Sequence, residues 1–299
     1  MFAVAGRNAV RRAWTATTGG ASSFGSAVGS GGASSSSSSS TGSRTQEIIG
    51  HAGVRLVAFG WGFFIAENLI LSENRTRIIN RIGDAGYHFL YNTCSTLSLG
   101  CIAWGYLNHG RRQGPLLWKV TPGMRGASIG FSLLGALGFA QLLPTLRSPA
   151  SFVSALSDAS ASRKNLCPMD FEAERRSSTI TTPHGIKRIT RHGSLWSFAA
   201  LSVGCALRTP FATEVALFLG PVPTVLCLGW HMDSRFRRQM GGDILEHHGA
   251  DWPFTSHLPF GALIGGAQEW APLLEEWKKT NAAVAATSVA LYALAHFRK

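Results

Sequence analysis

The chain has 299 residues, a net charge of +12 and only 15% charged residues. Soluble globular domains carry about 25% charged residues. The composition therefore argues against a soluble domain and favours a membrane protein, because a charge in hydrocarbon costs several kcal/mol. The sequence has no nucleic-acid-binding motif and no basic stripe interleaved with aromatic residues, so we expect the positive charge to meet membrane lipids and predict no nucleic-acid partner.

The first 49 residues are predicted to lie outside the folded domain. Arg7, Arg11 and Arg12 have apolar residues and no acidic residue between them, and a Gly/Ser-rich tract with a serine run at 34–40 follows. Such composition is typical of organelle transit peptides, whereas a secretory signal needs an uninterrupted apolar stretch. We expect a transit peptide and disordered segment at 1–49 and one membrane domain at 50–299. The arginines favour the mitochondrial inner membrane, and the serine tract leaves a plastid membrane as the alternative.

Apolar segments of membrane length recur through the rest of the chain. A helix needs about 20 residues to cross a bilayer, and we predict such segments at 52–71, 86–107, 124–146, 194–207, 211–230 and 282–297. The predicted fold class is an all-α integral membrane protein with five to six transmembrane or half-spanning helices. Only Arg208, Thr209 and Pro210 separate the fourth and fifth segments, which predicts a tight hairpin. Gly220 and Pro221 are expected to kink the fifth segment.

Four motifs follow one another in a characteristic order. They are Y-H-F-L-Y-N at 87–92, G-I-K-R-I-T-R-H at 185–192, D-S-R at 233–235 and T-S-H-L-P-F-G-A-L-I at 255–264. Taken in this order, residues 52–297 resemble the NnrU family, and specifically its 15-cis-ζ-carotene isomerase branch. The resemblance implies a helical membrane fold and a heme b whose iron state switches cis–trans isomerisation of a carotenoid or isoprenoid double bond.

The chain departs from the isomerase branch at the positions that the resemblance links to heme. One histidine is expected late in the first helix, where this chain has F-I-A-E-N at 64–68. Another is expected thirteen residues after the T-R-H histidine, where Cys205 stands, and the proline expected after T-R-H is Gly193. Two functions therefore stay open: a heme-linked cis–trans isomerase, and a non-catalytic membrane scaffold or supernumerary subunit of a larger mitochondrial membrane complex.

Four residues are candidates for cofactor binding, and no catalytic residue is assigned. Arg191 offers paired N–H donors to a heme propionate or lipid phosphate, and His192 offers ring nitrogens to iron; the alternative for both is an interfacial helix cap. Cys205 is a second candidate iron ligand, against a packing role. Glu67 is an ionisable residue in an apolar span, so it is a candidate functional residue; the alternative is a buried structural pair with a basic residue of a neighbouring helix. The cysteines form no C-x-x-C pair, so no disulfide or zinc site is predicted.

The spacing around the T-R-H motif predicts its geometry. Arg188, Arg191 and His192 would share one face of a helix at the membrane boundary, where they would bind an anion. The structural alternative is pairing with Glu172, Glu174 or Asp233. Asp233 itself is expected in a polar surface cluster with His231 and Arg235 at the end of the fifth segment.

Overall fold

The structure, a computed structural model, describes residues 39–146, 169–170, 183–240 and 252–297. Contacts divide the chain into two units, Met1–Gly42 and Ser43–Lys299. The first is described only where helix α2 (Ser39–Gly50) begins, so the following account concerns the second. The predicted transit segment therefore lies largely outside the described residues. The last residues of this segment are helical in α2, whereas the sequence predicted disorder there. Arg44 of α2 donates a 2.7 Å hydrogen bond to the Leu116 carbonyl.

Helices α3 (Ala52–Glu73) and α4 (Arg75–His109) form an antiparallel hairpin. Small residues let the two backbones approach closely, as is common between membrane helices. A Cβ added to Gly60 would lie 2.5 Å from Ile102 Cγ1, so only glycine fits this contact. The first turns of α4 are set off from the rest by Gly83, whose φ of 77° interrupts the helical geometry. The helix beyond Gly83 matches the predicted segment 86–107.

Helices α5 (Pro122–Leu142) and α9 (Gly193–Ala206) pack against each other in the same way. A Cβ on Gly135 would lie 2.6 Å from the Ser197 carbonyl oxygen, so the α5 backbone lies directly on α9. The predicted segment 124–146 ends early, at Leu142. The next residue, Leu143, precedes a proline and is extended, as proline requires of its neighbour.

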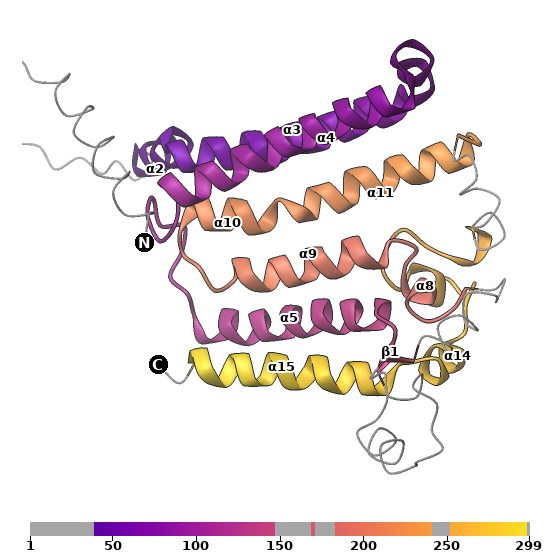
Figure 1. The fold of residues 1–299 in the computed structure, drawn as a ribbon. Coiled ribbons are helices and arrows are strands. Elements are labelled where there is room, and N and C mark those ends of the chain that lie inside the picture. Colours follow the sequence, from indigo (N-terminus) through magenta and orange to yellow (C-terminus); the bar gives the residue numbers. More distant parts are fainter. Residues whose placement is uncertain (1–38, 147–168, 171–182, 241–251, 298–299) are drawn as a thin grey trace, which may run out of the picture. The chain divides into compact units, whose positions relative to one another are not determined.

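The predicted fifth segment forms two helices, α10 (Ala212–Leu219) and α11 (Pro221–Arg237), which meet at Gly220. The C-terminal helix α15 (Lys279–Phe297) packs on α5. Side by side in the second unit lie the α3–α4 hairpin, α10 with α11, α9, α5 and α15 (Figure 1). The remaining described elements are short: α8 (Ile186–Ile189), α13 (Gly261–Ile264), α14 (Trp270–Glu275), a 3₁₀ turn (Trp252–Phe254), and the paired strands β1 (Thr145–Leu146) and β2 (Met169–Asp170).

The prediction of an all-α fold is confirmed. Two helices are long and apolar enough to cross a membrane by length and composition, Ala52–Glu73 and Ala212–Arg237 taken through Gly220. Helix α9 has 14 residues, or about 21 Å, which is shorter than a hydrocarbon core of about 30 Å. This length fits the prediction that some of the helices span only part of the membrane. Large apolar side chains such as Phe89 and Trp104, 75% and 61% exposed, face outward where lipid would cover them.

Candidate functional site

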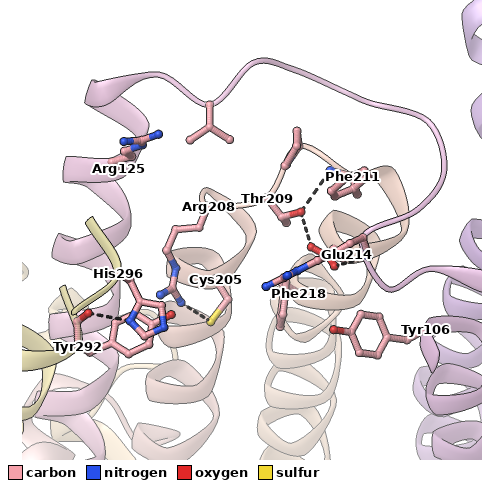
Figure 2. A pocket seen from close by; sticks show the side chains of 13 residues that line it. Tyr106, Arg125, Cys205, Arg208, Thr209, Phe211, Glu214, Phe218, Tyr292 and His296 are labelled. Atoms are coloured by element: carbon pink, nitrogen blue, oxygen red, sulfur yellow. Dashed lines mark hydrogen bonds between the residues drawn. The ribbon is translucent and has the colours of Figure 1, made fainter. Parts of the chain in front are cut away.

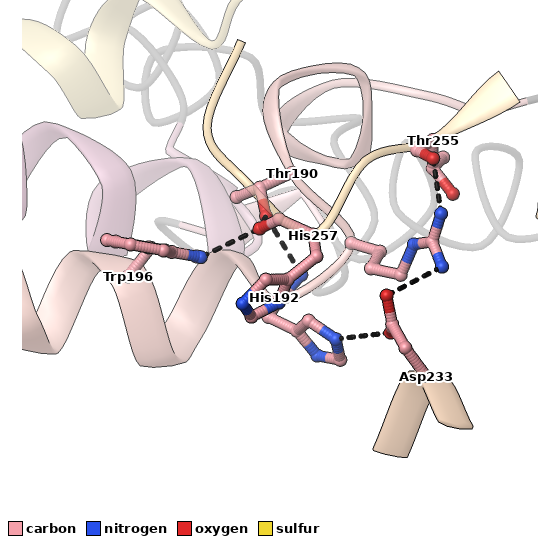
Figure 3. A network of polar contacts seen from close by, with 7 residues as sticks. Thr190, His192, Trp196, Asp233, Thr255 and His257 are labelled. Carbon is pink, nitrogen blue, oxygen red and sulfur yellow. Dashed lines mark hydrogen bonds and ion pairs between the residues drawn. The ribbon is translucent and has the colours of Figure 1, made fainter. Parts of the chain in front are cut away.

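Three segments that are distant in the sequence meet at the N-terminal end of α9 (Figure 3). Helix α8 ends at Ile189, and Thr190 is extended with a φ of −159°, which turns the chain into the loop that precedes α9. The Thr190 hydroxyl donates a 2.8 Å hydrogen bond to the His257 carbonyl, and the Arg191 backbone N–H donates one of 3.0 Å to the Ser256 carbonyl. These bonds bring the T-R-H motif and the T-S-H-L-P-F motif together beside the end of α11.

The Asp233 carboxylate on α11 is the centre of the site. Its Oδ1 lies 2.9 Å from His192 Nε2, and its Oδ2 accepts a 3.0 Å hydrogen bond from Arg191 Nη1. Asp233 and His192 are 4% and 7% exposed, so both side chains are withdrawn from water. Arg191 also donates to the Thr255 carbonyl. Burial lowers the pKa of Arg191, while the Asp233 charge opposes that shift.

His257 completes the cluster and was not among the residues predicted for the site. Its ring lies 5.3 Å from the His192 ring, at an interplanar angle of 69°. Both His257 ring nitrogens are buried, and neither has a hydrogen-bond partner among the described residues. Burial lowers the pKa of His257, and the neighbouring His192 lowers it further. Gly229, one turn before Asp233, makes room for the ring, because a Cβ there would lie 2.3 Å from His257 Cε1.

The cluster lies between two hollows of different character. We call the first, of about 340 Å³, the apolar groove; it lies along α5 and α9 and is lined by residues that include Phe131, Leu134, Leu137, Trp196, Val203 and Phe260. We call the second, of about 480 Å³, the polar cleft; its lining includes Arg191, Asp233, Arg237, Ser256 and His257. Trp196, which lines the groove, donates a 2.8 Å hydrogen bond to the His257 carbonyl. The segment from 255 to 260 therefore forms the wall that both hollows share.

Arg188 belongs to a separate network. Its Nε and Nη2 donate to the two oxygens of Glu276 at 2.8 and 2.6 Å, and the Gly185 N–H donates to the same carboxylate at 2.7 Å. The predicted common face for Arg188 and Arg191 is wrong, because the helix ends between them. Arg191 instead adopts the structural alternative, a pair with Asp233. Burial alone would raise the pKa of Glu276, but the hydrogen bonds from Arg188 and Gly185 outweigh it and lower that pKa.

The prediction that Asp233 belongs to a surface cluster with His231 and Arg235 is also wrong. Asp233 is buried, whereas His231 turns away and lies 2.6 Å from the Ser72 hydroxyl on α3. Residues two apart on a helix point in different directions, which separates the two side chains. The other predicted carboxylate partners of the arginines, Glu172 and Glu174, lie outside the described residues.

Cys205 lies at the other end of α9 from His192. Thirteen residues separate them, or about 20 Å along a helix. Figure 2 shows Cys205 facing a hollow of about 670 Å³ whose lining includes Arg125, Arg208 and Glu214. Arg208 Nη2 donates to the Cys205 sulfur at 3.0 Å. The prediction that His192, Arg191 and Cys205 surround one cofactor is therefore wrong, because two axial ligands of one iron must lie within a few ångströms of each other.

Glu67 is buried between α3 and α4. Its Oε1 accepts hydrogen bonds of 2.6 Å from Ser95 and 2.8 Å from Asn68. This end of α3 lies beside the C-terminal end of α11, through Ser72 and His231, whereas Cys205 lies near the start of α10. The two positions that the resemblance links to heme thus lie at different levels of the bundle and present a carboxylate and a thiol. The residues at these positions do not fit an axial pair for heme b.

The fold and the site define an all-α membrane protein with a buried polar cluster at one end of its helices. Residues 56–298 match the family described as NnrU protein, and the chain belongs to that family. Comparisons with curated proteins and with solved structures give no match. The cluster contains residues of three of the four motifs that carried the resemblance. The motifs at 233–235 and 255–264 were the signal that could have pointed to Asp233 and His257, which were not predicted for the site.

Proposed function

We propose that this NnrU-family membrane protein binds an isoprenoid lipid in the apolar groove and isomerises one of its double bonds. The observation that carries the proposal is the position of the groove against the buried cluster. Its lining is formed almost entirely by apolar side chains, which suits a hydrocarbon chain without unmatched polar groups. Trp196 is the link, because it lines the groove and its ring lies 6.0 Å from the ring of His257.

A cis–trans change transfers no group to or from the substrate. It requires only that one double bond temporarily lose its bond order, which an electrophile beside the bond can achieve. We assign this electrophilic role to the buried cluster of His192, His257 and Asp233, which lies beside Trp196 through the ring of His257. The groove would fix the chain of the substrate, and the cluster would act on the bond nearest Trp196. An organelle membrane, with the mitochondrial inner membrane favoured over a plastid membrane, is the proposed location.

The second candidate is a non-catalytic scaffold, or a subunit of a larger membrane complex. Glu67 and Cys205 favour it, because both are held by local hydrogen bonds at the positions where the isomerase branch is expected to carry heme-linked histidines. In this case structural membrane lipid would fill the groove.

The test separates the two candidates by filling the groove. Ala200 lines the groove, and Ala283 is an exposed residue of α15. Purified wild-type protein in mild detergent would be incubated with 15-cis-ζ-carotene, and binding and isomer composition would be measured by absorbance and chromatography. We expect Ala200→Phe to lose binding and conversion, and Ala283→Phe to retain both. Wild-type protein that neither binds nor converts the polyene, and that migrates in a larger complex on native electrophoresis, would establish the scaffold instead. A Soret band in the wild-type spectrum would restore heme to the mechanism.

A further inference from the structure

We propose that His192, His257 and Asp233 bind a single divalent transition-metal ion, of the Zn²⁺ or Fe²⁺ class. Two imidazoles and one carboxylate form a ligand set typical of such ions in proteins. This inference goes beyond the isoprenoid proposal and does not depend on it, because a metal site can exist in a scaffold as well as in an enzyme.

The distances in the cluster fit a shared ion. One ligand atom from each of the three residues lies within 4.8 Å of the other two. Two ligands about 2.1 Å from one metal lie about 3.0 Å apart at a right angle and about 3.4 Å apart in a tetrahedron. His192 Nε2 and Asp233 Oδ1 are already 2.9 Å apart. Each edge from the His257 ligand atom is at most 4.8 Å, so it would have to shorten by no more than about 1.4 Å to reach the tetrahedral spacing.

His257 distinguishes this site from a purely structural ion pair. A buried polar atom without a partner costs about 1–3 kcal/mol, and most native proteins avoid it. Both ring nitrogens of His257 carry this cost among the described residues, although Thr190 and Trp196 hold the His257 backbone carbonyl firmly at 2.8 Å. A metal ion would satisfy one ring nitrogen directly. Gly229 preserves the space that keeps the ring against His192 and Asp233.

Arg191 is the positioning residue of the proposed site. It binds Asp233 Oδ2 and leaves Oδ1 directed at His192, so it would fix the carboxylate in the orientation that binds metal. The polar cleft, which reaches Asp233 and His257, offers the fourth coordination position to water or to an anionic group. Arg237 in the same lining adds positive charge that favours an anion.

The test measures metal binding by the full-length protein. Protein purified in mild detergent would be stripped with chelator and titrated with Co²⁺, followed by absorbance, and with Zn²⁺ against a chromophoric chelator. We expect one ion per chain and a cobalt spectrum without a thiolate band. His257→Gln and Asp233→Asn should weaken Zn²⁺ binding at least tenfold, and Arg191→Lys about 10- to 100-fold. His231→Gln on the same helix should bind as the wild type does.

Two readouts guard against misfolding. Zn²⁺ should raise the unfolding temperature of the wild type and of His231→Gln but not that of His257→Gln, and all three should unfold at similar temperatures after chelation. The cobalt spectrum of the wild type reports nitrogen and oxygen ligands without any variant. Wild-type binding below one ion per chain, a thiolate band, or equal affinity in His257→Gln and the wild type would each overturn the metal site. None of these outcomes bears on polyene binding in the groove.

Discussion

The ion pair between Arg191 and Asp233 should be strongly coupled, and a double-mutant cycle can measure it. The side chains are 15% and 5% exposed, so removal of one partner leaves the other charge buried. Breaking such a pair typically costs about 3–5 kcal/mol, whereas replacing both charges with apolar residues of similar size is often neutral. We expect Asp233→Leu and Arg191→Met each to lower the unfolding temperature by about 6–20 °C, at about 2–4 °C per kcal/mol.

The double variant Arg191→Met/Asp233→Leu should recover most of that loss, although His192 then lacks its partner at a cost of about 1–3 kcal/mol. The assay is tryptophan fluorescence on heating, in one detergent and with chelator present, so that no metal contributes. Arg238→Met removes an exposed partner of Glu73 and serves as the control; we expect no measurable shift, because exposed pairs contribute little. Additive losses from the two single variants would refute the idea that Arg191 and Asp233 act as one buried unit.

Two further predictions test the packing and the second network. Gly135→Ala places a Cβ 2.6 Å from the Ser197 carbonyl oxygen, so α5 and α9 must separate. We expect the free energy of unfolding to fall by about 1–3 kcal/mol. The control is Gly130→Ala, whose Cβ meets nothing within 4 Å and which should unfold at the wild-type temperature. In the folded protein, burial would raise the pKa of Glu276, but the hydrogen bonds from Arg188 and Gly185 outweigh burial and lower it. The ionised Glu276 therefore stabilises the folded state fully above the unfolded pKa of about 4.3. This stabilisation is lost as the pH falls through the folded pKa. The unfolding temperature should therefore fall more steeply below pH 4 in the wild type than in Glu276→Gln, and parallel curves would contradict this.

Local sequence determined most of the long helices. Apolar runs predicted α3, α5, α9 and α15 to within a few residues, because a mostly apolar segment in lipid is stable as a helix, which satisfies its own backbone hydrogen bonds. The tight connection at 208–210 was also predicted from local sequence, because Pro210 lacks the backbone N–H that continuation of the helix requires. The ordered motifs also indicated the family, which residues 56–298 confirm.

Only the tertiary structure decided which motif residues meet. The sequence grouped Arg188 with Arg191 because helical spacing was assumed to continue across Thr190. It grouped Cys205 with His192 because the resemblance expects a heme-linked histidine at position 205. The break at Thr190 sends the two arginines to different carboxylates, and the length of α9 places Cys205 about 20 Å from His192. His257 and Asp233 reach the same cluster from segments far apart in the chain. Such proximity depends on how helices pack, and packing is set by close contacts such as the one at Gly229, which no local pattern of residues reveals.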